Sequence, residues 1–239
     1  MKPIALVKHL ILRCLDPLER RGIQFTMRRK IVPPAVLRDI TEYRKRSFCP
    51  FAHFDTAWRA MRHIEENSIL GDIVMCGVAT GGLARFMALH LPVHRRLWLY
   101  DTFDGGSLPG EKDTEHDRSI GEHCKRVMAT DFKEVERYVS DGCLHQDALR
   151  WVVGDIMKTI PERMPKKIAL LYLDTDWYES TAHELRHLEP LVSPGGIIIQ
   201  DDMGLCLGAA RAVHEYYAMR TPRPYIAAID EAGCQWQKI

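Results

Sequence analysis

The segment KIALLYLDTDWYEST, residues 167–181, does most to define the fold of this chain. Its first half is a continuous apolar run, which is typical of a strand covered by helices on both faces of a parallel sheet. Two aspartates, Asp174 and Asp176, follow at the point where that strand should end. Ligands of open α/β sheets bind beyond the carboxyl ends of the strands, so the segment predicts a buried strand and a candidate site.

Similar apolar runs alternate with helical patterns along the chain, as in α/β proteins. The further predicted strands are residues 72–78, 96–103, 149–156 and 195–202. The predicted helices between and after them include residues 83–91, 180–191 and 207–220. Two last runs, at 222–230 and 233–239, are separated by a turn and predict an antiparallel hairpin. The predicted fold class is therefore α/β, with a doubly wound, Rossmann-like, mostly parallel sheet of seven strands that ends in this hairpin.

The chain divides into a helical N-terminal extension, residues 1–55, and the sheet domain, residues 56–239. The extension begins with an amphipathic helical pattern, whose charged residues disfavour a signal peptide. Asp55 is expected to cap the next helix, because apolar side chains recur at helical spacing around and after it. The charged connection at 104–146 has a helical pattern only near 130–140, and we predict that it is a lid or substrate-binding segment.

Composition and charge narrow the class of protein. With 239 residues, 46% of them hydrophobic, the chain has the profile of an ordinary globular domain, and a net charge of +1 gives no general attraction to nucleic acid. No stretch approaches the roughly 18 apolar residues that span a membrane. Seven scattered cysteines without CxxC spacing predict no disulfide framework. We expect a cytoplasmic protein that acts on a small molecule; its oligomeric state stays open, a homo-oligomer included.

A glycine-rich loop, CGVATGGLARF at 76–86, follows the first strand of the sheet. Its G-x-x-x-G-G spacing is not the dinucleotide fingerprint, and a tight turn would explain it by itself. Asp101 ends the second strand, however, where a carboxylate can accept from the hydroxyls of a ribose. Asp155 follows the next apolar run and can accept from an adenine amine. The loop and the two acids together predict a nucleoside pocket.

Four carboxylates are expected at one edge of the sheet, because two neighbouring strands end in Asp174 and Asp176 and in Asp201 and Asp202. Like charges at this spacing raise one another's pKa unless a cation compensates. Oxygen ligands of this kind suit Mg²⁺ or another hard cation. The alternative is that one aspartate caps the helix at 180 and that the others are solvated. Because two separate strand ends supply acids, we favour the metal site.

Three other classes of enzyme share parts of this pattern. A DxD sequence also occurs in haloacid-dehalogenase-type phosphatases, but there it follows the first core strand. A metal-dependent glycosyltransferase would use the DxD to bind nucleotide-sugar phosphates and would leave the glycine loop unexplained. HELRH at 183–187 matches the HExxH pattern of zinc proteases. Helical spacing places His183 and His187 away from the apolar stripe, so we expect them to face solvent and not to bind zinc.

Five segments together resemble the macrocin O-methyltransferase family. They are CGVATGG at 76–82, WLYDTFDG at 98–105, GDIMKTIP at 154–161, the block at 171–202 and GAARAVHEYY at 208–217. The likeness extends over about residues 55–220. It implies a class I methyltransferase fold and an S-adenosylmethionine- and Mg²⁺-dependent enzyme that methylates a hydroxyl of a sugar or another small polyhydroxylated metabolite, as family members do in antibiotic biosynthesis.

The resemblance also assigns roles to individual residues. The implied cofactor-binding set is Gly77, Val78, Ala79, Gly81, Gly82, Asp101, Thr102, Phe103, Gly154, Asp155 and Asp174. The implied metal-binding set is Asp174, Asp176, Asp201 and Asp202. Asp174 is implied as the general base, although the catalytic roles of Asp174 and Asp176 are open to exchange.

One position departs from the family. Met75 stands two residues before the first glycine of the loop, where the family usually has a glutamate that helps to hold the ammonium of the cofactor. A degenerate adenosylmethionine-binding protein without activity is therefore an alternative, as is the metal-dependent glycosyltransferase. The retained aspartates argue against a degenerate protein.

Overall fold

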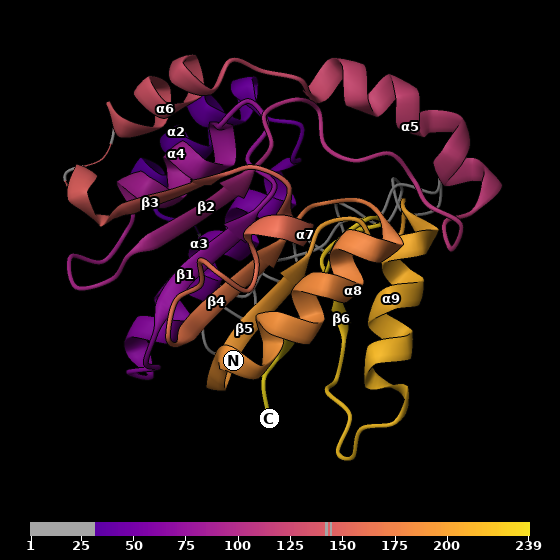
Figure 1. The fold of residues 1–239 in the computed structure, drawn as a ribbon. Coiled ribbons are helices and arrows are strands. Elements are labelled where there is room, and N and C mark those ends of the chain that lie inside the picture. Colours follow the sequence, from indigo (N-terminus) through magenta and orange to yellow (C-terminus); the bar gives the residue numbers. More distant parts are fainter. Residues whose placement is uncertain (1–31, 142, 144) are drawn as a thin grey trace, which may run out of the picture. The chain divides into compact units, whose positions relative to one another are not determined.

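The computed structural model describes residues 32–141, 143 and 145–239 (Figure 1). Residues Ala35–Ile239 form one compact unit. The predicted amphipathic pattern at the N-terminus lies outside the described residues, so the division at residue 55 stays a prediction. Among the described helices, none is long and apolar enough to cross a bilayer. The cysteines at 49, 76, 124, 143, 206 and 234 are free thiols.

The predicted sheet is confirmed. In chain order its strands are β1 (Asp72–Cys76), β2 (Leu97–Asp101), β3 (Leu149–Val153), β4 (Ile168–Leu173), β5 (Val192–Gln200), β6 (Ala227–Ala228) and β7 (Cys234–Gln237). In the described part of the chain they form a seven-stranded sheet in the order β3-β2-β1-β4-β5-β7-β6. The first five strands are parallel, and β7 pairs antiparallel with both β5 and β6. This is the doubly wound arrangement with a terminal hairpin.

Helices cover both faces of this sheet. In chain order the described helices are α2 (Pro34–Tyr43), η1 (Arg44–Arg46), α3 (Phe51–Glu66), α4 (Gly82–Leu89), α5 (Glu115–Met128), α6 (Phe132–Ser140), η2 (Gln146–Ala148), α7 (Ile156–Thr159), α8 (Tyr178–His187), η3 (Glu189–Leu191) and α9 (Leu207–Ala218). Figure 1 shows α7, α8 and α9 on one face and α3 and α4 on the other. Strands β1 and β4 are therefore buried on both sides, as their apolar runs require.

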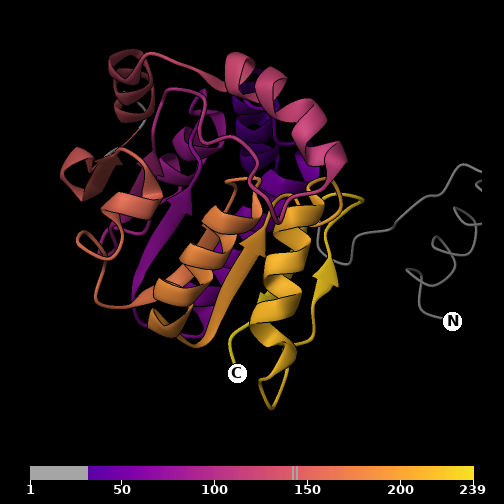
Figure 2. The same cartoon turned by 45° about the vertical axis from the view of Figure 1, so that its right-hand side comes forward.

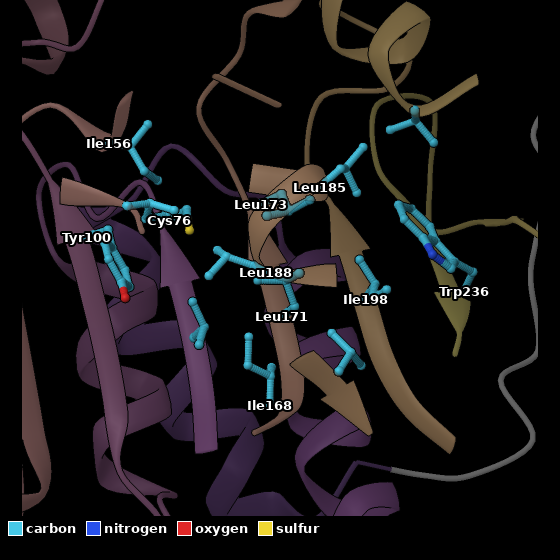
Figure 3. Close-up of a cluster of buried hydrophobic side chains, with 14 of the residues drawn as sticks. Cys76, Tyr100, Ile156, Ile168, Leu171, Leu173, Leu185, Leu188, Ile198 and Trp236 are labelled. Atoms are coloured by element: carbon cyan, nitrogen blue, oxygen red, sulfur yellow. The ribbon is translucent and has the colours of Figure 1, made fainter. Parts of the chain in front are cut away.

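The core between the sheet and α7, α8 and α9 is made of aliphatic and aromatic side chains from strands and helices (Figure 3). Leu171 of β4 and Leu185 of α8 are fully buried there, and Trp236 of β7 closes the cluster at the hairpin end. On the opposite face, the rings of Phe54 and Phe86 lie 5.3 Å apart and join α3 to α4. These two cores hold the parallel strands in register.

Helix α3 begins earlier than predicted. Pro50 is its N-cap, so Asp55 lies in the second turn and not at the start. The Asp55 side chain is buried and pairs with Arg59 at 3.1 Å, one turn later. The expectation that Asp55 caps the helix was wrong, because the chain already turns into the helix after the proline, whose missing N–H costs nothing at a helix start.

The connection between β2 and β3 contains α5 in addition to the predicted helix at 130–140, which is α6. A capping box starts α5: the Thr114 hydroxyl accepts from the Asp117 N–H, and the Asp117 carboxylate accepts from the Thr114 N–H. The same carboxylate accepts from Leu207 and Gly208 at the start of α9. Figures 1 and 2 show α5 across the end of the sheet to which the parallel strands point.

Leu171→Ala tests whether β4 is the centre of the core. Because Leu171 is fully buried, removing its side chain should lower the free energy of unfolding by about 2–5 kcal/mol. Leu70→Ala is the matched control, since Leu70 is 65% exposed and should change stability by less than about 0.5 kcal/mol. Urea denaturation measures both, and equal losses would contradict the assignment.

Candidate functional site

Three neighbouring strands end at the same level of the sheet. Cys76 of β1 pairs with Leu173 of β4, and Leu173 pairs with Gln200 of β5. The next residue on each strand therefore faces the same edge: a glycine on β1 and an aspartate on each of β4 and β5. A Cβ on Gly77 would overlap the backbone oxygen of Asp174, so only glycine lets β1 and β4 stay this close at their ends.

A cavity of about 810 Å³ lies at this edge. The predicted site residues that line it are Gly77, Ala79, Asp101, Thr102, Gly154, Asp155, Asp174, Asp176, Asp201 and Asp202. The structure therefore brings Asp101, Asp155 and part of the glycine-rich loop to one cavity with all four aspartates of the predicted metal site. Thr175 and Trp177, which flank Asp176, also line it, as do residues of the segment 104–146.

Four predicted cofactor residues lie outside the cavity lining: Val78, Gly81, Gly82 and Phe103. Close packing explains why two of these positions are glycine. A Cβ on Gly82 would overlap the carbonyl of Arg46, and a Cβ on Gly81 would lie 2.9 Å from Val135. These glycines let η1 and α6 pack on the loop. The Phe103 ring packs 5.1 Å from that of Phe132, centroid to centroid.

Asp101 holds the glycine-rich loop as well as facing the cavity. One carboxylate oxygen accepts from the N–H groups of Val78 and Ala79, at 2.6 and 2.8 Å. The other accepts from the N–H of Phe103 at 2.7 Å. A carboxylate offers about four acceptor sites, so at least one remains for a ligand hydroxyl. Ala79 and Phe103 both have positive φ, which these bonds to Asp101 stabilise.

Asp155 has a structural role beside its place in the cavity. It is the N-cap of the short helix α7, and its carboxylate accepts from the Met157 N–H at 3.0 Å. Strand β3 ends at Val153, and Gly154, with a φ of 132°, turns the chain from β3 into α7. The predicted strand through residue 156 is therefore shorter, since glycine permits the turn there.

The four aspartates at the ends of β4 and β5 form two adjacent groups. Oxygen atoms of Asp174 and Asp201 lie within 4.8 Å of each other and of the Cys49 sulfur. Oxygen atoms of Asp176 and Asp202 form the second group, with the Cys206 sulfur, at the same limit. Asp176 has a φ of 66°, a left-handed conformation that turns its carboxylate back toward the cavity.

Burial and mutual repulsion make these carboxylates hard to ionise. Burial, with the charge of Asp201 next, raises the pKa of Asp174 well above its ordinary value. Burial, followed by the charge of Asp176, does the same to the pKa of Asp202. Burial raises the pKa of Asp176 to about 6. Asp202 Oδ2 is buried and has no hydrogen-bond partner in the structure. This donor set fits a hard divalent cation, which would satisfy the orphan oxygen and offset the repulsion.

His53 of α3 also belongs to this site, although it lies in none of the predicted motifs. Its ring is fully buried, and Nδ1 hydrogen-bonds to Asp201 while Nε2 lies 3.0 Å from Asp230. Burial lowers the pKa of His53, but the two carboxylates outweigh it and raise the net value. Tyr172 donates to the same oxygen of Asp201. No local pattern marks His53, since Asp201 is 148 positions away in the chain.

The groups of described residues whose ligand atoms lie close enough to hold a metal ion do not include His183 or His187 of the HExxH match. His183 was expected to face solvent, but it is buried and its ring nitrogen lies 3.1 Å from the carbonyl oxygen of Ile160. That expectation was wrong because the chain after α7 covers this side of α8. Glu184 is buried as well and accepts from the Thr175 hydroxyl at 3.0 Å, below the floor of the cavity. Burial raises the pKa of Glu184 to about 8, so it is largely protonated at neutral pH.

The chain matches known methyltransferases. Residues 51–238 match the model of the macrocin-O-methyltransferase (TylF) family. The chain is 34% identical over 177 residues to demethyldecarbamoylnovobiocin O-methyltransferase of Streptomyces niveus, covering 72% of this chain and 68% of the relative. It is also 34% identical, over 180 residues, to 8-demethyl-8-(2,3-dimethoxy-alpha-L-rhamnosyl)-tetracenomycin-C 4'-O-methyltransferase of Streptomyces olivaceus, covering 72% and 67%. The structure of the O-methyltransferase NovP aligns with a TM-score of 0.72 and 31% identity, covering 79% of this chain and 80% of that one.

Glu184→Gln tests the buried neutral acid. The folded pKa of about 8 exceeds the unfolded value of 4.5, so the folded state binds more protons between these values and wild-type stability should fall as pH rises through this window. The free energy of unfolding of Glu184→Gln, relative to that of wild type, should therefore increase between pH 5 and 8 by up to about 1.4 kcal/mol per pH unit and then level off.

Urea denaturation across this pH range measures the difference. Glu111→Gln is the control, since Glu111 is exposed and its variant should follow the wild-type pH dependence. A difference in the free energy of unfolding between wild type and Glu184→Gln that stays constant over the whole pH range would mean that Glu184 is ionised in the folded state.

Proposed function

Because this chain belongs to the macrocin-O-methyltransferase family and is an O-methyltransferase, we propose that it transfers the methyl group of S-adenosylmethionine to a sugar hydroxyl, with the help of a divalent cation. A hydroxyl of another small polyhydroxylated metabolite is the wider class of acceptor. The observation that carries the proposal is the single cavity lined by both the nucleoside residues and the four aspartates. Donor and acceptor would meet there at the carboxyl edge of the sheet.

The cofactor would bind along the ends of β1, β2 and β3. Gly77 and Ala79 leave backbone atoms accessible at the end of β1, and the remaining acceptor site of Asp101 suits the ribose. Asp155 lies in the same cavity after β3, where it would accept from the adenine amine. Met75 is 1% exposed and packs in the core, so it offers no charge to the ammonium group. Asp174, one residue beyond the paired strand β4, is the carboxylate best placed to replace the usual glutamate.

The cation would be held between the two groups, by Asp176 and Asp202 of one and Asp201 of the other, with Asp174 beside them. When bound, such an ion would lower the pKa of the acceptor hydroxyl and orient it toward the methyl group. Asp174, which lies in the same cavity beside these ligands, would accept the proton of the acceptor hydroxyl, or Asp176 if the two aspartates exchange roles.

The segment 104–146 supplies the wall of the cavity on the acceptor side. Ser107, Leu108, Lys125 and Met128 line the cavity, and Trp177 Nε1 donates to the Ser107 carbonyl at 2.9 Å. Because α5 lies across the open end of the sheet, we propose that this segment covers the bound acceptor and excludes water (Figure 2). Its mixture of apolar and polar atoms suits a glycoside better than a strongly charged substrate.

Adenosylhomocysteine should raise the melting temperature by binding the folded state. Asp155→Asn keeps an N-cap for α7 but loses the charge, so it should weaken binding of adenosylhomocysteine by about tenfold. The exposed Asp147→Asn is the control and should bind as wild type does. Calorimetric titration measures the affinities. Stabilisation by a nucleotide sugar, with none by adenosylhomocysteine, would favour a glycosyltransferase.

Activity should be lost in EDTA and return with Mg²⁺. Asp202→Asn should lower kcat at least about 100-fold, because it replaces a charged oxygen ligand with a neutral amide oxygen. Without metal the same variant should melt higher than wild type, because asparagine removes the cost of burial and repulsion that raises the pKa of Asp202. Glu179→Gln, an exposed carboxylate of the same cavity, should keep its metal affinity. Methylation that persists in EDTA would contradict the metal role.

A further inference from the structure

His53 joins two carboxylates that are far apart in the chain. Its Nδ1 hydrogen-bonds to Asp201 Oδ1 after β5, and its Nε2 lies 3.0 Å from Asp230 Oδ2 in the turn before β7. The ring is completely buried between them. Helix α3 therefore reaches the carboxyl edge of the sheet through this one side chain and connects it to the C-terminal hairpin.

The surroundings of the ring are shaped to hold it in place. Asp230 Oδ1 accepts from the N–H groups of Ala232 and Gly233 at 3.0 and 2.9 Å, which fixes the carboxylate on the far side of the ring. A Cβ on Gly233 would lie 2.5 Å from His53 Cε1, so the turn can carry only glycine there. The imidazole thus has little freedom to rotate, and its contact with Asp201 is directional.

Asp201 is consequently oriented by protein groups at one of its two oxygens. Oδ1 accepts from both His53 and the Tyr172 hydroxyl. No hydrogen bond to Oδ2 is found among the described residues, although Asp201 lines the cavity beside Asp174. Asp202, the next residue, has no hydrogen bond at its own Oδ2 in the structure. The pair therefore presents one free carboxylate oxygen from each residue.

We propose that His53 is a positioning residue for the divalent cation: it holds Asp201 by Oδ1 so that Oδ2 is available as a ligand. This inference rests on the proposed metal-dependent function. It assigns a role to α3 and to the hairpin turn, neither of which contributes a carboxylate to the predicted metal set. Groups that orient metal-binding carboxylates commonly change metal affinity 10–100-fold when they are removed.

Two isosteric substitutions separate the two contacts of the ring. The amide nitrogen of asparagine falls near the position of Nδ1, so His53→Asn keeps a donor to Asp201 and loses the contact with Asp230. The amide nitrogen of glutamine falls near Nε2, so His53→Gln does the reverse. Calorimetric titration with Mn²⁺ should give His53→Asn a Kd within about threefold of wild type, and His53→Gln a Kd about 10–100-fold higher.

Two further variants make the result specific. Tyr172→Phe removes the other donor to Asp201 Oδ1 and should weaken Mn²⁺ binding in the same direction. His63→Asn, in the same helix but bonded to the Gly195 carbonyl, should leave the Kd unchanged. The melting temperature of each variant without metal is measured in parallel, because a merely structural role would order the variants by stability and not by Mn²⁺ affinity.

The outcomes distinguish this inference from the function on which it rests. If wild type and His53→Gln bind Mn²⁺ equally, the positioning role of His53 is wrong while the metal site stands. If wild type itself binds no Mn²⁺, the proposed metal dependence fails, and the role of His53 fails with it. A ranking in which asparagine rescues the affinity and glutamine does not would support the assignment.

Discussion

The crowding of four carboxylates at the ends of β4 and β5, two of them buried and two half-buried, is the constraint on which this structure depends. Taking charges out of water is costly, and bringing like charges together adds to that cost. The protein offsets part of it with His53 and Tyr172, which donate to Asp201. The remaining cost of ionising these carboxylates raises the pKa of Asp174, Asp176 and Asp202. Such an arrangement is unfavourable for stability alone, and the proposed binding of a divalent cation would offset its cost.

The surrounding elements hold this edge of the sheet in a fixed geometry. Parallel pairing of β1, β4 and β5 sets the strand ends level, and Gly77 lets two of them approach closely. Asp101 fixes the glycine-rich loop, and Asp117 ties the start of α5 to the start of α9. In both places a carboxylate positions backbone N–H groups, a role that needs no metal.

The fold was largely predictable because its signals are local. Continuous apolar runs identify strands covered on both faces, and the C-terminal turn marks the hairpin. Helix boundaries are less predictable: the residue type of Asp55 suits an N-cap, but Pro50 already starts α3. Helix α5 is highly charged, so its pattern does not predict a helix. Its capping box, the contact of Asp117 with α9 and the packing of Ile120 and Cys124 against a buried cluster define it.

The sequence by itself determined the order of the strands along the chain, the aspartates that follow β4 and β5, and the likeness to a family of methyltransferases. Only the tertiary structure decided which residues share the cavity. The tertiary structure packed Gly82 against η1 and Gly81 against α6, buried His183, and brought His53 to Asp201. The physical reason is distance along the chain: periodicity and spacing report neighbours within a few turns, whereas a buried hydrogen bond between α3 and the end of β5 exists only once the sheet has assembled.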